Sequence, residues 1–193
     1  MKSLHASTRC YGLILILLAV WLGGCTPSTV PVEGAVSESE QPPGADPFPP
    51  SAYEGRLEPF AYGLGDYTEA LIEELGEPQA MDFFAGGLYF SYADVVYFTD
   101  AELSEGDEIN HGSVKRIGMR PGTGLFGVTV GDPLPELAGV LGAGSLHSPE
   151  DNVNDGYYEG QWTLHYALGD YELVFTAESE DGPSIAAYYE ERA

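Results

Sequence analysis

The sequence predicts an α+β fold in which two copies of one unit, a helix followed by an antiparallel three-stranded meander, form a single sheet with helices on one face. Two observations predict this fold. Two short amphipathic helix patterns share the same internal spacing, and each is followed by three short runs typical of strands. We expect the folded domain to span residues 56–193, with repeat one at about 56–120 and repeat two at about 121–193.

The two helix patterns have matching ends. Each begins at a Gly-Asp pair and closes ten residues later on a Leu-Gly pair, at Gly65-Asp66 and Leu75-Gly76 in one half and at Gly131-Asp132 and Leu141-Gly142 in the other. An aspartate suits a helix N-cap, and a glycine suits the left-handed residue that ends a helix. We therefore expect Asp66 and Asp132 to cap two helices of similar length, with Pro133 at the first helical position of the second.

Three strands are expected after each helix. They fall at 88–92, 95–99 and 114–119 in the first half, and at 162–168, 171–177 and 185–189 in the second. The alternative interpretation is a single α+β domain that happens to contain two similar hairpins.

The first 24 residues have the pattern of a secretory signal peptide. Lys2 and Arg9 precede a 13-residue apolar run, 10–22, which is too short for a membrane-spanning helix. The sequence Leu22-Gly23-Gly24-Cys25 that follows resembles the bacterial lipobox, which implies cleavage before Cys25 and attachment of lipid to its thiol. The alternative is an ordinary secreted protein whose cleavage site precedes a cysteine.

The remaining cysteine and the proline-rich segment agree with a lipid anchor. Cys10 lies within the signal core, so the processed chain keeps only Cys25 and has no partner for an intramolecular disulfide. Residues 25–55 hold seven of the 14 prolines, which predicts an extended, disordered tether. We expect a protein on the extracytoplasmic side of the cell membrane, with the membrane contacted through lipid on Cys25.

The folded part also resembles a known domain. A short helix of the form Gly-Asp, eight residues, Leu-Gly, followed by a tyrosine-rich meander, is similar to the SmpA/OmlA (BamE-like) lipoprotein domain. In tandem it resembles the fold of the β-lactamase-inhibitor protein. The resemblance implies an envelope lipoprotein with a non-catalytic binding fold, and it assigns no site.

Composition excludes one class of partner. The formal charge is −24 for the whole chain and −26 after removal of residues 1–24, with 31 acids against five bases. The largest basic cluster is Lys115-Arg116, which is too small to follow a phosphate backbone, so no nucleic-acid partner is expected.

Known catalytic and metal-binding patterns fit the sequence poorly. His111, His147 and His165 have no metal-ligand spacing, and the segment 151–162 lacks two of the oxygen ligands that an EF-hand-like calcium loop requires. We expect no catalytic residue, metal or cofactor, and no enzyme activity. The alternatives are an inhibitor of an extracellular enzyme, or an extracytoplasmic hydrolase.

Strand alternation predicts which residues meet a partner. The bulkier apolar parity in the second half, Trp162, Leu164, Tyr166, Leu173 and Phe175, is assigned to the helix-covered side. The alternate residues of these strands are assigned to an open face, which carries His165, Glu172, Val174 and Tyr188 in the second half. The matching residues of the first half are Tyr89, Val95 and Tyr97. Because tyrosine suits protein interfaces, we expect this face to bind an unidentified envelope or extracellular protein. The alternative is that these side chains only shield a solvated sheet.

Overall fold

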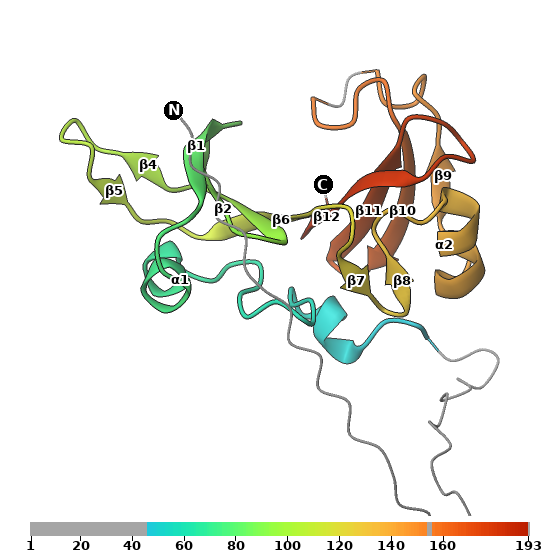
Figure 1. The fold of residues 1–193 in the computed structure, drawn as a ribbon, viewed down its shortest axis with the longest axis horizontal. Helices are drawn as coiled ribbons and strands as arrows, with labels where there is room; N and C mark the ends of the chain where they lie inside the picture. The colour runs from blue at the N-terminus through green and yellow to red at the C-terminus, as the bar shows by residue number, and fades with distance from the viewer. Residues whose placement is uncertain (1–45, 154–155, 193) are drawn as a thin grey trace, which may run out of the picture. The chain divides into compact units, whose positions relative to one another are not determined.

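The structure, a computed structural model, describes residues 46–153 and 156–192. Within those residues its body is one antiparallel sheet of eight strands, with two helices and two short ribbons (Figure 1). The sheet consists of β1 Ala80–Phe84, β2 Gly87–Ser91, β3 Val95–Thr99, β6 Val114–Met119, β9 Ser145–His147, β10 Trp162–Leu168, β11 Tyr171–Ala177 and β12 Ser184–Glu191. The ribbons are β4 Glu102–Leu103 with β5 Ile109–Asn110, and β7 Gly124–Leu125 with β8 Val128–Thr129. The expected α+β class is confirmed, with a body that is mostly sheet.

The order of strands across the sheet is β1-β2-β3-β6-β12-β11-β10-β9. All six expected strands form within two residues of their expected bounds. The last strand of the first meander, β6, pairs with the last strand of the second, β12. Strands β1 and β9, which the sequence analysis did not anticipate, form the two edges.

A tight hairpin joins β1 to β2. Phe84 pairs with Gly87, and both residues of the connection, Ala85 and Gly86, have positive φ values of 50° and 98°. Two consecutive left-handed residues are characteristic of the type I′ turn, whose twist matches that of the strands it joins.

The helices α1 Thr68–Leu75 and α2 Leu134–Leu141 form where expected but begin differently. The N-cap positions are Tyr67 and Pro133, and neither helix has a side-chain cap, so the prediction of aspartate caps is wrong. Asp66 instead accepts a hydrogen bond from the Gly63 N–H and forms an ion pair with Arg56. The glycine ends are confirmed, since Gly76 and Gly142 have φ values of 79° and 85°.

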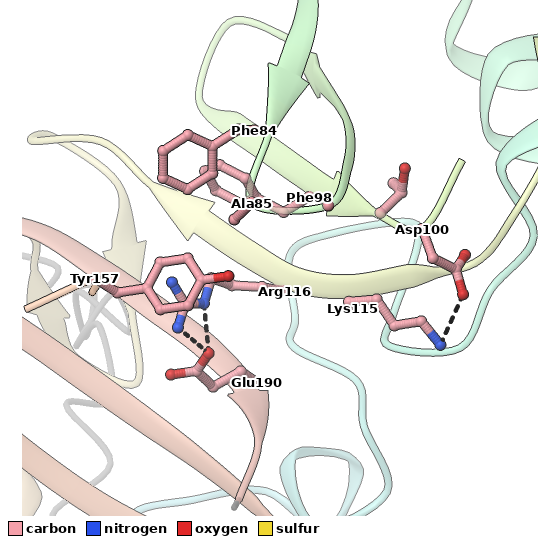
Figure 2. Close-up of a pocket in the computed structure, with 10 residues that line it drawn as sticks. Phe84, Ala85, Phe98, Asp100, Lys115, Arg116, Tyr157 and Glu190 are labelled. Atoms are coloured by element: carbon pink, nitrogen blue, oxygen red, sulfur yellow. Dashed lines mark hydrogen bonds and ion pairs between the residues drawn. The ribbon is translucent and has the colours of Figure 1, made fainter. Parts of the chain in front are cut away.

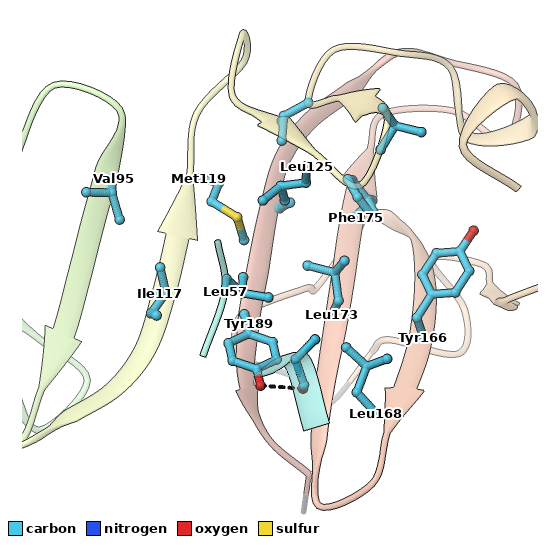
Figure 3. Close-up of a cluster of buried hydrophobic side chains, with 14 of the residues drawn as sticks. Leu57, Val95, Ile117, Met119, Leu125, Tyr166, Leu168, Leu173, Phe175 and Tyr189 are labelled. Atoms are coloured by element: carbon cyan, nitrogen blue, oxygen red, sulfur yellow. Dashed lines mark hydrogen bonds between the residues drawn. The ribbon is translucent and has the colours of Figure 1, made fainter. Parts of the chain in front are cut away.

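One face of the sheet, called here the core face, packs into the main buried cluster (Figure 3). Register places one row of its side chains across five adjacent strands, namely Tyr97, Ile117, Tyr189, Leu173 and Tyr166. Leu71 of α1 and Leu134, Leu137 and Leu141 of α2 belong to the same cluster. Burial of this apolar surface is the main term that stabilises the fold.

The folded unit begins before residue 56, which corrects the expected end of the tether. Residues Pro50–Tyr53 form a short 3-10 helix in which Ala52 is fully buried. The Tyr189 hydroxyl donates a hydrogen bond of 2.7 Å to the Ala52 carbonyl, and Phe48 packs against Phe126. The sequence analysis overlooked this segment because its prolines suggested an extended chain. Proline is compatible with the first turn of a helix, and the aromatic and alanine side chains between the prolines reach the core.

The predicted signal peptide and Cys25 lie outside the described residues. Among the residues that are described, no helix is both long and apolar enough to cross a bilayer.

Candidate binding face

The face of the sheet opposite the core face, called here the second face, carries the alternate residues of the same strands. One row consists of Tyr89, Phe98, Arg116, Glu190 and Glu172. The next row consists of Val96, Gly118, Tyr188, Val174 and His165. Aromatic and charged side chains therefore share this face, on strands that come from both halves of the chain.

Part of the second face lies beneath a covering segment, defined as residues 148–153 and 156–161. Its Asn152 side chain donates hydrogen bonds to the Gln161 carbonyl and to the Thr163 hydroxyl, at 2.9 and 3.1 Å. Its Tyr158 is 2% exposed and donates a 2.5 Å hydrogen bond to a carboxylate oxygen of Glu190. The covering segment thus supplies side chains to the interior of the fold.

Arg116 is the charged centre of the second face. Its side chain is 9% exposed and forms an ion pair with Glu190. The guanidinium carbon lies 3.5 Å from the Tyr157 ring centroid and 5.3 Å from the Tyr188 ring centroid. Such contacts hold a guanidinium that little water can reach, because ring faces attract cations and the carboxylate neutralises the charge.

The same surroundings affect the phenols next to Arg116. Burial, followed by the negative charge of Glu190, raises the pKa of Tyr158 far above its ordinary value of 10. Burial also raises the pKa of Tyr188, against the opposing effect of Arg116. Both phenols are therefore neutral over the physiological range of pH.

A pocket of about 190 Å³ opens beside Arg116 (Figure 2). Phe84, Phe98 and Tyr157 form its aromatic walls. Two ion pairs lie along it, the buried pair of Arg116 with Glu190 and a solvated pair of Lys115 with Asp100 at 3.1 Å. Both basic side chains of this pocket are thus already paired with acids.

Asp100 has a structural role at the rim of this pocket. Its carboxylate accepts a 2.6 Å hydrogen bond from the Ser113 N–H as well as contacting Lys115. Burial alone would raise the pKa of Asp100, but these two contacts outweigh burial and the pKa is lowered. The carboxylate thereby joins the end of β3 to the start of β6.

Ring contacts continue across the second face from β2 to β9. The sequence of contacts is Tyr89 to Phe98 at 6.1 Å, Phe98 to Tyr188 at 6.5 Å, Tyr188 to Tyr158 at 5.8 Å, Tyr158 to His165 at 6.0 Å and His165 to His147 at 4.6 Å. Gly118 makes the second contact possible, because a Cβ there would lie 3.0 Å from the Phe98 ring and 3.4 Å from the Tyr188 ring. The missing side chain on β6 lets rings from β3 and β12 meet above it.

Three of the four predicted partner-binding residues lie in this set of ring contacts. Tyr89, His165 and Tyr188 are each half-buried on the second face. His165 is further held by contacts from its two ring nitrogens to Glu172 and Thr163, at 3.1 and 2.9 Å.

The fourth predicted residue, Tyr97, is a correction. It is 1% exposed within the core, and Val95 lies on the same core face. Tyr89 pairs with Phe98, so odd-numbered residues of β2 share a face with even-numbered residues of β3. Tyr89 and Tyr97 therefore point to opposite faces, and grouping them by parity alone was wrong.

The remaining candidate residues have local contacts. His111 contacts the Thr68 hydroxyl at 3.1 Å, and the Ser148 hydroxyl donates to the Asp151 carboxylate at 2.8 Å. Ser148 thus directs its proton to an acid instead of to neighbouring His147, which is unlike a serine nucleophile activated by histidine. Within the part of the chain that is described, no group of three or more His, Cys, Asp or Glu side chains is arranged to hold a metal ion.

No protein-family model and no curated protein matches the chain. Among solved structures, the crystal structure of a DUF4309 family protein (YjgB) from Bacillus subtilis subsp. subtilis str. 168 is similar, with a TM-score of 0.48 and 15% sequence identity. The similarity covers 74% of this chain and 91% of that protein. The resemblance to the SmpA/OmlA domain stays a prediction.

Proposed function

We propose that this protein is a non-catalytic binding protein of the cell envelope. In this proposal, lipid on Cys25 holds it on the extracytoplasmic side of the membrane, and the second face binds an envelope or extracellular protein. The support for the anchor is the signal-like segment followed by the lipobox at Leu22–Cys25.

The ring contacts across the second face are the observation that carries the binding role. Tyr89, Phe98 and Tyr188 present half-buried rings, and Phe84 and Tyr157 add rings that are 47% and 43% exposed. Rings held in place by neighbours lose little entropy on binding and bury a large area, which is why aromatic side chains are enriched at interface hot spots. Because both bases of the adjoining pocket are ion-paired, the site favours docking over holding a reacting anion.

We further propose that the two halves of the domain are copies of one unit. In support, each half has an eight-residue helix followed by three strands that are neighbours in the sheet. Across the sheet, the first half runs from its first strand to its last, β2-β3-β6, and the second half runs from its last strand to its first, β12-β11-β10. A two-fold relation about the central β6–β12 pair would give this order.

Cross-linking in native membranes tests the binding role. We expect wild-type protein to cross-link a defined partner, and the double variant Tyr89→Ala with Tyr188→Ala to lose it, since each hot-spot truncation costs on the order of 2 kcal/mol of binding. The matched control is Tyr53→Ala with Tyr67→Ala, which removes two exposed rings elsewhere. Equal capture by both double variants, with both melting as cooperatively as wild type, would rule out the second face.

The anchor is tested separately. Cys25→Ser should abolish incorporation of labelled lipid and either release the protein or leave its signal peptide uncleaved. Full membrane retention of the variant without lipid label would contradict the assignment.

A further inference from the structure

The edge strand β1 has several features of a docking edge. All five of its residues are exposed, and Met81, Phe83 and Phe84 are 40%, 59% and 47% exposed. Strand β1 pairs with β2 in a register without a bulge, and its sequence contains neither lysine nor proline. The Phe83 N–H donates a 2.8 Å hydrogen bond to the carboxylate of its neighbour Asp82, a local contact that an added strand would displace. Sheet edges in natural proteins are ordinarily blunted by such devices, because an open edge offers backbone N–H and C=O groups to another strand.

The opposite edge of the sheet provides a comparison. Strand β9 has three residues, of which Leu146 is 45% exposed, whereas β1 has five residues with three large apolar side chains. Length and apolar exposure together make β1 the better template for an added strand.

The charge around β1 identifies the kind of segment that it can accept. Between residues 57 and 114, which include α1 and β1 to β5, the sequence has thirteen acids and no lysine or arginine. The bases that approach β1 from β6 and beyond are Lys115 and Arg116, which are ion-paired with acids beside Phe84, and Arg120, which bonds to the Ser91 hydroxyl opposite Ala80. Asp82, in the middle of β1, is one of these acids. An incoming strand with lysine or arginine side chains would therefore meet an attractive field, and an acidic strand a repulsive one.

A second copy of the chain fits this edge poorly. Because Asp82 is the central residue of β1, the antiparallel pairing that matches all five residues places Asp82 opposite Asp82. Like charges directly opposite one another destabilise a strand pair, and two chains with a formal charge of −24 each also repel.

We infer that β1 binds an extended segment of a partner protein as an additional antiparallel strand, in which basic side chains alternate with apolar ones. Asp82 pairs with Tyr89 and so lies on the second face, whereas Met81 and Phe83 pair with Phe90 and Leu88 on the core-face side. A basic residue of the added strand sits opposite Asp82, and its apolar neighbours contact Met81 and Phe83. This inference goes beyond the proposed second-face function and can fail without it.

Peptide binding to the folded protein tests the inference. The probe is a fluorophore-labelled peptide with the core Lys-Val-Lys-Val-Lys, whose central lysine would face Asp82. We expect it to bind with NMR shifts concentrated in β1 and its partner strand, and with slower amide exchange in β1. The same peptide with alternate backbone N-methyl groups, which keeps the charge but cannot form strand hydrogen bonds, should bind at least about tenfold more weakly. A Glu-Val-Glu-Val-Glu peptide should bind equally weakly.

Matched charge reversals locate the binding on the protein. Asp82→Lys should lower the affinity for the lysine peptide about three- to tenfold. Glu105→Lys makes the same charge change on an exposed loop in the same acidic stretch, and it should lower that affinity less than about twofold. Tyr188→Ala, on the second face, should leave peptide binding unchanged.

Several outcomes would overturn the inference. Equal binding of the N-methylated peptide would mean adsorption by charge alone, and no binding of either peptide would exclude this edge. Loss of binding in Tyr188→Ala but not in Asp82→Lys would assign the peptide to the second face. A dimer in sedimentation that is strengthened by Asp82→Asn would show that a second copy occupies β1.

Discussion

The two halves of the sheet share one architecture but cover their second faces differently. In the half formed by β10, β11 and β12, Thr163, Val174 and Thr176 are at most 1% exposed. In the half formed by β2, β3 and β6, Tyr89, Val96 and Phe98 on this face are only half-buried, and the buried Arg116 on β6 is covered by Tyr157 of the covering segment. The sheet alone therefore does not determine whether this face meets solvent.

The difference comes from where each half places its long connection. The connection between β9 and β10 includes the covering segment, which carries Tyr158 and Asn152 onto the second face. The connection between β3 and β6 instead forms the ribbon β4–β5, whose Ile109 packs with Leu88 and Phe90 on the core-face side. One half thus gains a lid of aromatic and amide side chains, and the other keeps an open aromatic surface bordered by acids.

The largest expected effect is loss of that lid. Tyr158→Ala should lower the free energy of unfolding by about 4 kcal/mol, because it empties a buried aromatic site and removes a hydrogen bond to Glu190. Tyr157→Ala, one residue away and 43% exposed, should cost about 1 kcal/mol at most, from its contact with Arg116. Urea denaturation measures both, and similar losses in the two variants would mean that the covering segment does not bury Tyr158.

The two ion pairs beside the pocket give a smaller contrast. Glu190→Gln should lower the free energy of unfolding by about 3 kcal/mol, because it leaves the buried Arg116 guanidinium without its counter-charge. Lys115→Met breaks a pair whose side chains are 55% and 49% exposed, and should cost at most about 1 kcal/mol. Thermal melts of wild type and of each variant at two salt concentrations would check the contrast. The stability lost in Lys115→Met should shrink at high salt, because salt screens the solvated pair, whereas the loss in Glu190→Gln should stay the same. An equal salt response in both variants would argue against burial of Arg116.

Alkaline pH offers a third measure of the lid. The pKa of Tyr158 is raised in the folded protein, mainly by burial and then by Glu190, so the stability linked to its protonated form is fully present below pH 10. That stability is lost as pH rises above 10, by about 1.4 kcal/mol per pH unit for one proton. Tyr158→Phe should therefore flatten the alkaline fall in stability relative to wild type, with Tyr157→Phe as the reference. An unchanged slope would mean that Tyr158 ionises as it does in the unfolded chain.

Local sequence patterns predicted the helices and six strands because these elements depend on periodicity and on glycine at the ends. The caps were mispredicted because Asp66 and Asp132 bond to loop amides, at Gly63 and Thr129, instead of helix amides. Both edge strands were overlooked because they depend on contacts with other segments and not on a local pattern. Strand β1, with the sequence Ala-Met-Asp-Phe-Phe, is held by its turn and by pairing with β2, and a sequence read alone does not show that pairing.

The second face was predictable only in part. His165 and Tyr188 were placed correctly because the parity of each long strand in the second half was clear from Leu164, Tyr166 and Phe175. Tyr97 was misplaced because face membership across a hairpin depends on register, which the turn between β2 and β3 sets. The role of Arg116 had no sequence signal, since its burial depends on Glu190 and Tyr157, which lie 74 and 41 positions away.

The smallest expected change in stability concerns the open half. Phe83 is 59% exposed, the most exposed of the large apolar side chains in the described residues, and its cross-strand partner Leu88 is 1% exposed. Phe83→Ser should change the free energy of unfolding by about 0.5 kcal/mol or less, because little buried area is lost. Leu88→Ala, on the neighbouring strand, should cost about 3 kcal/mol, because it leaves a cavity in the small cluster with Phe90. Urea melts with unchanged m-values would confirm that the contrast lies in the native contacts. A loss above about 2 kcal/mol in Phe83→Ser would mean that β1 is covered in the folded protein, and the open edge would then belong to neither half.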